Sequence, residues 1–391
     1  MSETMRIMLP GPTPIPDSVL REMARPMINH RGKEFRVLFE SITEDLKWAY
    51  QTRNDVFILT TSGSGAMEAA IVNTLSPSDR VLACVAGEFG KRFAQIAETY
   101  GASVDRLEAP YGSPITPEMV ADKLRGVHYK AVLVTHNETS TALLNPVGEI
   151  AAVIRQALPD ALILVDSVSG LGTAPLPVDD WDLDVVLAGA QKAFMVPPGL
   201  AFASVSPRAW AAHAEARMPR FYFDFGQARD FARKGQTPWT PAISLFFALA
   251  RAMEMLKAEG LETIYARHDR LMRMVRAGAR ALGLGLVQND DRYASRAVTG
   301  IYSPEGLHPS RIQALLQEKF GYVVAGGQGP LVDTIFRVGH LGYYDDTDML
   351  GLLAALEAVL SESAISVQPG AAVGAALEVR RQSLHRAQES I

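Results

Sequence analysis

Short apolar runs alternate with stretches of helical period through the first 240 residues of the chain. Such alternation is typical of a parallel β-sheet covered by helices. Two of the runs, residues 130–135 and 161–165, are continuously apolar and bounded by polar residues, as buried parallel strands are. The predicted strands are 57–60, 80–85, 130–135, 161–165, 184–187 and 201–205, with helices from about residue 66 and over 91–100.

The pattern changes after Pro241, where two long helical patterns follow each other over residues 244–282. Beyond them, shorter strands and helices alternate again. We therefore predict an α/β protein with a mostly parallel, helix-covered sheet and a smaller C-terminal α/β unit, divided near residues 255–285 through a long connecting helix. The elements predicted in the smaller unit are strands at 297–302 and 334–338 and helices at 310–318 and 347–361.

The two ends of the chain differ from both units. Residues 9–14 carry three prolines, which remove backbone donors and fix φ, so this segment is expected to be an arm on the surface or over a cleft. The tail, residues 374–391, is predicted to be a polar helix with little apolar face.

Composition narrows the function classes. The 391 residues carry 38 basic and 43 acidic side chains, so the chain offers no cationic field for nucleic acid or an anionic membrane. Its single cysteine, Cys84, excludes an intramolecular disulfide framework, a thiolate zinc cage and an iron–sulfur cluster. No apolar run approaches the ~18 residues of a membrane helix. Without a secretory signal in residues 1–9 or a peroxisomal ending, we expect a soluble, cytoplasmic protein with no bound metal.

The turn Ser62-Gly63-Ser64-Gly65 follows a predicted strand and opens a helix. Free backbone N–H groups and the helix dipole make such a turn an anion site, with the two serine hydroxyls as further donors. Glu68 stands where the dinucleotide fingerprint needs its third glycine, and no Gly-Lys-Ser/Thr sequence of a Walker A loop occurs. Taken alone, the segment is better explained as an ordinary strand-to-helix turn.

Two further polar residues, Asp166 and Lys192, follow the predicted strands 161–165 and 184–187. Asp166 ends the apolar run 161–165, where open α/β sheets place their ligands, although it also suits a helix N-cap. Lys192 lies in an apolar stretch that would desolvate its ammonium and lower its pKa, as an amine that attacks a carbonyl requires. A lysine whose stem is buried and whose amine reaches water is the alternative.

Together these features match what pyridoxal phosphate needs from a protein. The turn would hold the phosphate, Asp166 would keep the pyridine nitrogen protonated, and Lys192 would form the Schiff base. An aromatic face should stack on the ring, and Phe89 follows a strand in a suitable turn, although plain core packing also explains it.

On these residues the chain resembles the class V aminotransferases of pyridoxal-phosphate fold type I, in particular the alanine–glyoxylate, serine–glyoxylate and serine–pyruvate group. The resemblance runs in order through nearly the whole chain. The matching stretches are Pro10-Gly11-Pro12-Thr13-Pro14, residues 62–70, 87–92 and 135–141, Val165-Asp166-Ser167-Val168, Gln191-Lys192-Ala193, Pro197-Pro198-Gly199 and Phe336-Arg337-Val338-Gly339.

The resemblance implies a role for each matching residue. Lys192 carries the internal aldimine and then acts as the proton-shuttling base, and Asp166 pairs with the pyridine nitrogen. Arg337 grips the substrate carboxylate with two parallel hydrogen bonds, and Gly11 bounds the side-chain pocket. The further cofactor contacts implied are Ser62, Gly63, Ser64 and Gln191 at the phosphate, Phe89 and Val168 on the faces of the ring, and Thr139 beside the ring hydroxyl.

Residues 236–241 resemble the segment that reaches the phosphate of a neighbouring subunit, which implies a homodimer with shared sites and places Thr237 and Thr240 among the cofactor contacts. The implied domains are an arm over the active site at 1–20, a large cofactor-binding domain at 21–260 and a small C-terminal domain with a terminal helix at 261–391. The implied reaction is ping-pong transamination between alanine or serine and glyoxylate or pyruvate, since an arm-crowded pocket favours small side chains.

Several rivals share the resemblance. Cysteine desulfurase needs a mobile nucleophilic thiol, and Cys84 lies in a predicted buried strand, so we reject it. Ureidoglycine–glyoxylate aminotransferases tend to have Gln where His30 stands, which counts against that specificity. Aspartate and 2-aminoethylphosphonate transaminases stay open because Arg31 can serve a second anionic group, as does a related lyase. A non-catalytic subunit that binds a partner is the alternative from another class.

Overall fold

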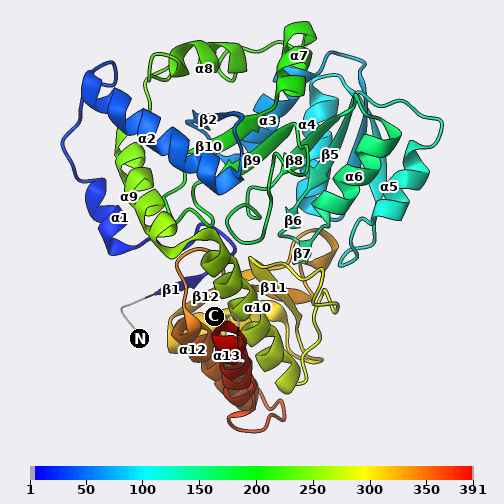
Figure 1. Ribbon diagram of the computed structural model, residues 1–391. Coiled ribbons are helices and arrows are strands. Elements are labelled where there is room, and N and C mark those ends of the chain that lie inside the picture. The colour runs from blue at the N-terminus through cyan, green and yellow to red at the C-terminus, as the bar shows by residue number, and fades with distance from the viewer. Residues whose placement is uncertain (1–4, 390–391) are drawn as a thin grey trace.

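The computed structural model describes residues 5–389, and Figure 1 shows two units that are joined by long helices. In the larger unit, seven strands form one sheet in the order β2-β10-β9-β8-β5-β3-β4. Strand β10 is antiparallel to both neighbours, and the other neighbouring pairs are parallel. The predicted α/β architecture is confirmed. The strands are β2 (Asp55–Leu59), β3 (Arg80–Val85), β4 (Ser103–Glu108), β5 (Ala131–Thr135), β8 (Leu162–Asp166), β9 (Val185–Gly189) and β10 (Ala201–Val205).

Helices cover both faces of this sheet, because successive side chains of a strand point to opposite faces. In β5, Val132 and Val134 belong to one apolar cluster, whereas Ala131 and Leu133 belong to the other. The first cluster is closed by α2 (Lys33–Tyr50), α5 (Pro117–Leu124), α6 (Val147–Ala157) and α9 (Ile243–Glu259). The second is closed by α3 (Gly63–Thr74), α4 (Glu88–Thr99), α7 (Pro207–Glu215) and α8 (Phe225–Ala232).

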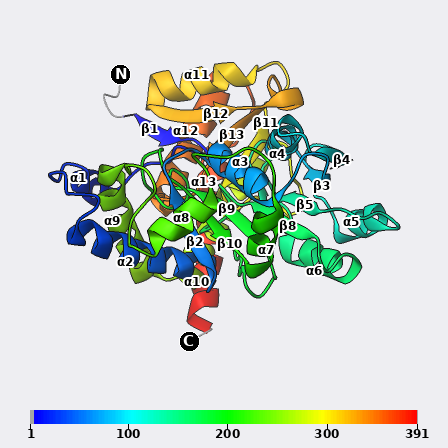
Figure 2. The ribbon, with the colours of Figure 1, turned by 90° about the horizontal axis from the view of Figure 1, so that it is seen from above.

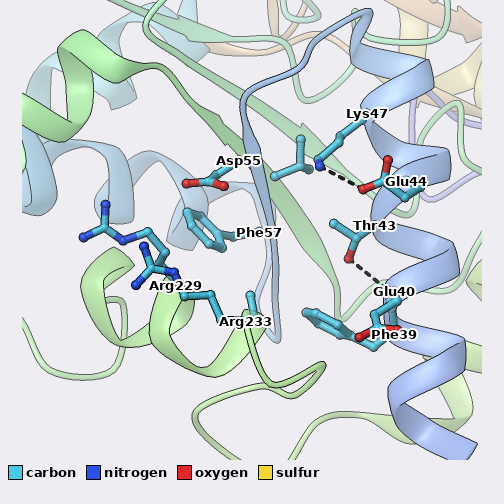
Figure 3. A pocket seen from close by; sticks show the side chains of 11 residues that line it. Phe39, Glu40, Thr43, Glu44, Lys47, Asp55, Phe57, Arg229 and Arg233 are labelled. Carbon is cyan, nitrogen blue, oxygen red and sulfur yellow. Dashed lines mark hydrogen bonds and ion pairs between the residues drawn. The ribbon is translucent and has the colours of Figure 1, made fainter.

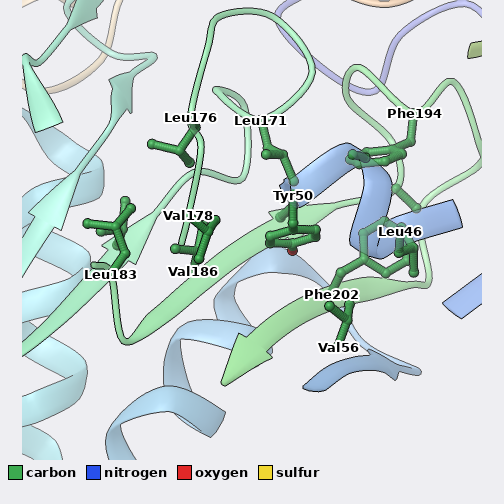
Figure 4. Close-up of a cluster of buried hydrophobic side chains, with 14 of the residues drawn as sticks. Leu46, Tyr50, Val56, Leu171, Leu176, Val178, Leu183, Val186, Phe194 and Phe202 are labelled. Atoms are coloured by element: carbon green, nitrogen blue, oxygen red, sulfur yellow. The ribbon is translucent and has the colours of Figure 1, made fainter. Parts of the chain in front are cut away.

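The amphipathic helix α2 is not among the predicted elements, although its apolar residues recur at helical spacing. Phe35, Phe39, Ile42 and Leu46 are buried, and Tyr50 closes the helix within the first cluster. Figure 4 shows the Tyr50 ring among aliphatic side chains of the sheet and of the connection after β8. Burial raises the pKa of Tyr50 well above its ordinary value, so its hydroxyl stays neutral.

The smaller unit is built on a four-stranded sheet in the order β1-β12-β13-β11, shown at the lower part of Figure 1. Strand β1 pairs parallel with β12, and the other pairs are antiparallel. The strands are β1 (Arg6–Met8), β11 (Val298–Tyr302), β12 (Tyr322–Gly326) and β13 (Ile335–Gly339). The helices are α10 (Leu261–Ala281), α11 (Pro309–Phe320), α12 (Asp346–Glu362) and α13 (Ala371–Glu389).

Short elements complete the chain. The helix α1 (Asp17–Glu22) follows the proline-rich arm, and η1 (Gly329–Leu331) precedes β13. The strands β6 (Asn137–Glu138) and β7 (Leu143–Leu144) form a separate hairpin after β5. Figure 2 shows β1 and α11 together on one side of the molecule and α5 and α6 on another.

Three details differ from the sequence expectations. Residues 6–8 of the predicted arm form β1 within the small sheet, and the expected boundary after residue 20 falls inside α1. Residues 1–4 and 390–391 of the predicted arm and tail lie outside the described residues.

The third difference concerns the tail, whose helix α13 begins at Ala371, three residues before the predicted tail. Ala372, before the predicted start, and Ala376, within the tail, are fully buried in the core of the small unit, with Val379 partly buried beside them. Alanines four residues apart form a narrow apolar stripe that allows close helix approach but contributes little to a hydropathy pattern. Within residues 5–389, no helix is long and apolar enough to cross a membrane.

Candidate active site

Five of the predicted site residues gather at one edge of the large sheet. Ser62 follows β2, Phe89 follows β3, Thr139 follows β5, Asp166 ends β8, and Lys192 lies three residues beyond β9. These strands run in the same direction, so their carboxyl ends open on the same edge. Open α/β sheets bind their ligands at this edge.

Lys192 meets the proline-rich arm. Its Nζ donates a hydrogen bond to the carbonyl of Pro10 at 2.7 Å, and its own carbonyl accepts from the Thr13 hydroxyl at 3.1 Å. Burial lowers the pKa of Lys192 to about 8, against the opposing effect of the Asp166 carboxylate. The ammonium is therefore much easier to deprotonate than that of a surface lysine, which is what a nucleophilic amine requires.

Asp166 is 3% exposed at the end of β8. Burial raises its pKa to about 7, and the backbone N–H of Val168 opposes this shift with a hydrogen bond of 3.0 Å. Within residues 5–389, no other hydrogen bond to the carboxylate oxygens of Asp166 is found. A cationic partner with an N–H would stabilise the ionised form, and a protonated pyridine nitrogen is such a partner.

Two glycine backbones approach the side chain of Val168 closely. A Cβ on Gly63 would lie 2.7 Å from a methyl of Val168, and a Cβ on Gly189 would lie 3.1 Å from the other. The absence of side chains at both positions lets the first turn of α3 and the end of β9 approach Val168 closely. This contact fixes the valine between the anion-binding turn and the lysine segment.

The first turn of α3 has donors to spare. Ser62 is the N-cap residue, but its side chain makes no capping hydrogen bond, and the first N–H groups of any helix lack intrahelical partners. The buried Oε1 of Gln191 also has no partner, and its amide can present either O or N at that place. Free hydroxyl, amide and backbone donors at a helix N-terminus fit a phosphate monoester.

Glu138 positions the residue that is expected to stack on the ring. Its buried carboxylate accepts hydrogen bonds from the backbone N–H groups of Phe89 at 3.0 Å, Gly90 at 2.9 Å and Ser140 at 3.1 Å. Burial raises the pKa of Glu138, whereas these hydrogen bonds lower it. The carboxylate thereby anchors the N-terminus of α4 and with it the Phe89 ring.

Thr139 contacts a buried serine of the large unit and an arginine of the small unit. Its Oγ1 lies 2.7 Å from Oγ of Ser169. Its carbonyl accepts from Nη1 of Arg337 at 3.0 Å, although 198 residues separate the two. The small unit thus delivers Arg337 to the carboxyl edge of the large sheet.

Arg337 is 5% exposed and partly committed to the protein. Its Nε donates to the carbonyl of Gly326 at 2.7 Å, and Nη1 also donates to Oε1 of Gln328 at 3.1 Å. Burial lowers its pKa to about 10, against the effect of Glu138, so it remains cationic at neutral pH. No hydrogen bond of Nη2 is found within residues 5–389, so this amino group is available to a substrate carboxylate.

The predicted phosphate contacts near residue 240 belong to the segment between α8 and α9. The Thr237 hydroxyl donates to the carbonyl of Trp239 at 2.7 Å, and Arg31 donates to the Thr237 carbonyl at 2.7 Å. Thr237 and Thr240 line a hollow with residues 58–60. Within the described part of this chain they form no hydrogen bond with Ser62, Ser64 or Gln191, so their role at a neighbouring subunit stays a prediction.

Two contributors are absent from the sequence expectations. Glu138 stands in the motif 135–141, but its contact with the α4 N-terminus joins segments 48 residues apart. Arg92 donates to the Ser64 hydroxyl at 3.3 Å and lies over the Phe89 ring. The spacing of Phe89 and Arg92 by three residues on a helix is the signal that predicts their shared face.

A separate hollow of about 450 Å³ lies between α2, β2 and α8 (Figure 3). Lys47 pairs there with Glu44 at 2.8 Å, and Asp55 and Arg229 lie on the other side. Asp55 is the first residue of β2, whereas the predicted site follows its last residue. The hollow therefore belongs to the opposite edge of the sheet, and none of the predicted site residues lines it.

Comparisons with known proteins identify the relatives of this chain. The family model described as aminotransferase class-V matches residues 10–337. The small subunit of a soluble hydrogenase from Synechococcus sp. (strain PCC 6716) is 46% identical, over 97% of this chain and 99% of its own. L-aspartate–glyoxylate aminotransferase from Paracoccus denitrificans is 35% identical, over 100% and 99%. Serine–glyoxylate aminotransferase from Methylorubrum extorquens is 33% identical, over 96% of both chains.

Solved structures give the same picture of the fold. The crystal structure of ureidoglycine–glyoxylate aminotransferase from Bacillus subtilis superposes with a TM-score of 0.91 at 32% identity. The match covers 97% of this chain and 99% of that one.

Proposed function

Because the chain belongs to the class-V aminotransferases, which depend on pyridoxal phosphate, we propose that it transfers the amino group of L-alanine or L-serine to glyoxylate or pyruvate. The donor reacts in one half-reaction and the acceptor in the other, in ping-pong order.

The observation that carries the proposal is the convergence of Lys192, Asp166 and Arg337 on the carboxyl edge of the large sheet. Asp166 ends β8, Lys192 follows β9, and Arg337 comes from β13 of the small sheet. When bound, pyridoxal phosphate supplies the aldehyde and the electron-accepting ring on which amino groups are exchanged. Around it, the chain provides an amine with a lowered pKa, a buried carboxylate that needs a cation, and a guanidinium with one free amino group.

Lys192 would hold the cofactor and then move the proton. With a pKa of about 8, its amine is neutral often enough near neutral pH to accept a proton from Cα of the substrate. The free amine donates a hydrogen bond to the Pro10 carbonyl at 2.7 Å, so this carbonyl would orient Nζ again once the lysine is released from the cofactor. Asp166 would hold the ring nitrogen in its protonated form throughout.

Arg337 would bind the one group that every substrate shares. Amino acids and 2-oxo acids have the α-carboxylate in common, so a single guanidinium orients the donor in one half-reaction and the acceptor in the next. Its contacts with Gly326 and Thr139 keep the guanidinium plane fixed before the substrate arrives.

Small substrates are favoured by the arm. A Cβ on Gly11 would lie only 2.3 Å from Nζ of Lys192, so the arm backbone closes directly over the lysine. Little room remains on this side for a long side chain, which supports alanine and serine as donors. Two relatives with different named donors, aspartate and serine, share glyoxylate as the named acceptor, which supports glyoxylate here.

The proposed enzyme works as a cytoplasmic homodimer with shared sites. The support for the dimer is that Thr237 and Thr240 lie near an aromatic surface, and within the described residues they form no hydrogen bond with Ser62, Ser64 or Gln191 of their own chain. Tyr222 and Phe221 are exposed beside Trp239, as residues of a subunit interface are before assembly.

An absorbance spectrum of the purified protein tests the proposal. We expect a cofactor band that bleaches when L-serine or L-alanine is added and returns when glyoxylate is added. A band that responds to L-aspartate alone would replace the proposed donors with the donor named for one relative. A band that responds to no amino donor would overturn the transaminase proposal while keeping the cofactor.

A second candidate comes from the relative that is named as a hydrogenase subunit. In this reading the chain is a non-catalytic subunit that binds a partner, and the single cysteine, Cys84, buried in β3, contributes no set of thiolate ligands. A protein that stays colourless after addition of pyridoxal phosphate would favour this candidate. Retention of Lys192, Asp166 and Arg337 argues against it, because a binding subunit has no need of a desolvated lysine.

A further inference from the structure

Arg92 touches two of the residues that are expected to hold the cofactor. It lies in the first turns of α4, with an exposed side chain. Its Nη1 donates a hydrogen bond to Oγ of Ser64 at 3.3 Å, and its guanidinium carbon lies 4.9 Å from the centroid of the Phe89 ring. Arg92 therefore joins the turn that is expected to bind the phosphate to the ring that is expected to stack on the cofactor. The residues expected to bind the phosphate, Ser62, Gly63, Ser64 and Gln191, are called the cradle below.

The residues of the cradle do not balance the negative charge of a phosphate, and Arg92 can supply the missing positive charge. A phosphate monoester carries a charge of about −1.5 to −2 at pH 7. Ser62, Gly63, Ser64 and Gln191 are neutral, and the N-terminus of α3 contributes only a partial positive charge of about +0.5. A full cation beside Ser64 would balance much of the remainder.

Arg92 is not neutralised by a close carboxylate within residues 5–389. It forms no ion pair within 4.0 Å there, although its charge contributes to lowering the pKa of Glu88, whereas its helix neighbour Lys91 pairs with Glu88 at 3.1 Å. An arginine with free N–H groups, directed at a cluster of anion-binding donors, is suited to phosphate, which its fork can bind bidentately.

We propose that Arg92 is a cationic ligand of the cofactor phosphate, an inference that rests on the proposed function for the presence of pyridoxal phosphate. Ser64 and Arg92 then bind the phosphate together, from the first turns of α3 and α4. Because Arg92 also lies over Phe89, one side chain ties the position of the phosphate to that of the stacking ring.

The phosphate role is separable from a role in orienting Phe89. Pyridoxal has the same ring and aldehyde as pyridoxal phosphate but no phosphate. A phosphate ligand stabilises only the phosphorylated compound, whereas a residue that orients Phe89 affects both compounds equally. The comparison of the two compounds is therefore a thermodynamic test of which group Arg92 contacts.

The experiment uses the purified protein freed of cofactor by phenylhydrazine and dialysis, then titrated with pyridoxal phosphate or pyridoxal while the cofactor absorbance is followed. For Arg92→Gln we expect affinity for pyridoxal phosphate to fall about 10- to 100-fold, as expected for loss of a charge-assisted hydrogen bond, with affinity for pyridoxal within about twofold of wild type. Arg92→Lys should recover part of the loss. Inorganic phosphate should compete with pyridoxal phosphate in the wild type more strongly than in Arg92→Gln.

Arg106→Gln is the matched control. Arg106 lies in β4, pairs with Glu98 at 2.9 Å and has no contact with the predicted site, so its removal should change neither affinity. Equal losses for both compounds in Arg92→Gln would overturn the phosphate role in favour of Phe89 orientation. Unchanged affinity for both would overturn any role of Arg92 in the cradle.

The binding titration separates this inference from the proposed function. A wild type that binds pyridoxal phosphate but transfers no amino group would refute the proposed reaction, and the Arg92 comparison would still be decided by affinity alone. A wild type that binds no pyridoxal phosphate would overturn both.

Discussion

The Nζ of Lys192 donates a hydrogen bond to the carbonyl of Pro10, 182 residues earlier in the chain, at 2.7 Å. The contact joins the arm that leads out of the small sheet to the turn that follows β9 of the large sheet. It places a backbone acceptor at the one amine that the proposed chemistry requires. The lysine is thereby oriented before any cofactor binds, at the cost of an arm that must stay close to it.

Lys192→Ala should remove amino transfer while leaving the protein folded. The amine is proposed both to hold the cofactor and to move the Cα proton, so we expect activity to fall by about 10³-fold or more. Coupled assays with serine and glyoxylate measure the loss, and circular dichroism checks the fold. Lys257→Ala, at an exposed lysine paired with Asp45, is the control. Substantial transfer by the Lys192 variant would refute the assignment of this lysine.

The rate of cofactor incorporation should depend on pH through Lys192. Burial lowers the pKa of this amine to about 8, and only its neutral form attacks an aldehyde. The rate constant should therefore rise about tenfold per pH unit between pH 6 and 7 and level off above pH 8. Stopped-flow absorbance measures it.

The Asp166 carboxylate raises the pKa of Lys192. Removing this charge in Asp166→Asn should therefore move the midpoint of the incorporation profile to lower pH. A midpoint near pH 10 in the wild type would contradict the desolvation argument.

Asp166→Asn should stabilise the cofactor-free protein at pH 8. Burial raises the pKa of Asp166 from its ordinary value of 3.8 to about 7, so the folded state carries a penalty for the ionised carboxylate that is complete above pH 7 and shrinks as the pH falls toward 3.8. We expect a gain on the order of 1–4 kcal/mol in the free energy of unfolding at pH 8 and a smaller gain at pH 5.

Denaturant unfolding of the cofactor-free protein at both pH values measures this gain, with exposed Asp160→Asn as the control. The same Asp166→Asn variant should lose amino transfer, because an amide does not hold a ring nitrogen in its protonated form. A variant that is destabilised at pH 8 would show that Asp166 is stabilised by contacts within the chain instead.

Arg337→Lys should weaken every carboxylate substrate by a similar factor. Lysine keeps the charge but loses the planar fork and the contacts with Gly326 and Thr139. We expect kcat/KM to fall about 10- to 100-fold for serine, alanine, glyoxylate and pyruvate alike. Steady-state kinetics with each substrate decides this, and Arg53→Lys at a fully exposed site is the comparison. An effect confined to one substrate would argue against a common carboxylate clamp.

Gly11→Ala should disturb the lysine site, whereas the matched substitution Gly306→Ala should not. Gly11 has a φ of 127°, and a Cβ there would lie 2.3 Å from Nζ of Lys192. Backbone strain costs about 1–3 kcal/mol, and the clash adds displacement of the lysine. Gly306→Ala also forces a positive φ, of 79°, but has open space for its Cβ. Both variants should lose stability, whereas only Gly11→Ala should lose cofactor loading, measured by the absorbance ratio after gel filtration.

Much of the fold follows from local pattern. The continuously apolar β5, β8 and β9, the largely buried α9 and the amphipathic α10 appear in the sequence with ends that differ from the structure by at most two residues. Strand β4 does not, because half of its residues are charged and it forms an edge of the sheet with incomplete burial. Its position depends on pairing with β3, which no local pattern contains.

The sequence by itself determined which reactive or anion-binding residues lie at or just after strand ends. Asp166, Lys192 and the Ser62–Gly65 turn are local combinations of residue type and strand position. It also determined the family, since those combinations occur in a recognisable order. Only the tertiary structure decided that Pro10 faces Lys192, that Arg337 reaches Thr139 and that Glu138 anchors the turn of Phe89. These contacts join segments from 49 to 198 residues apart. The burial that shifts the pKa values of Asp166 and Lys192 likewise depends on the packing of distant segments, which no local pattern contains.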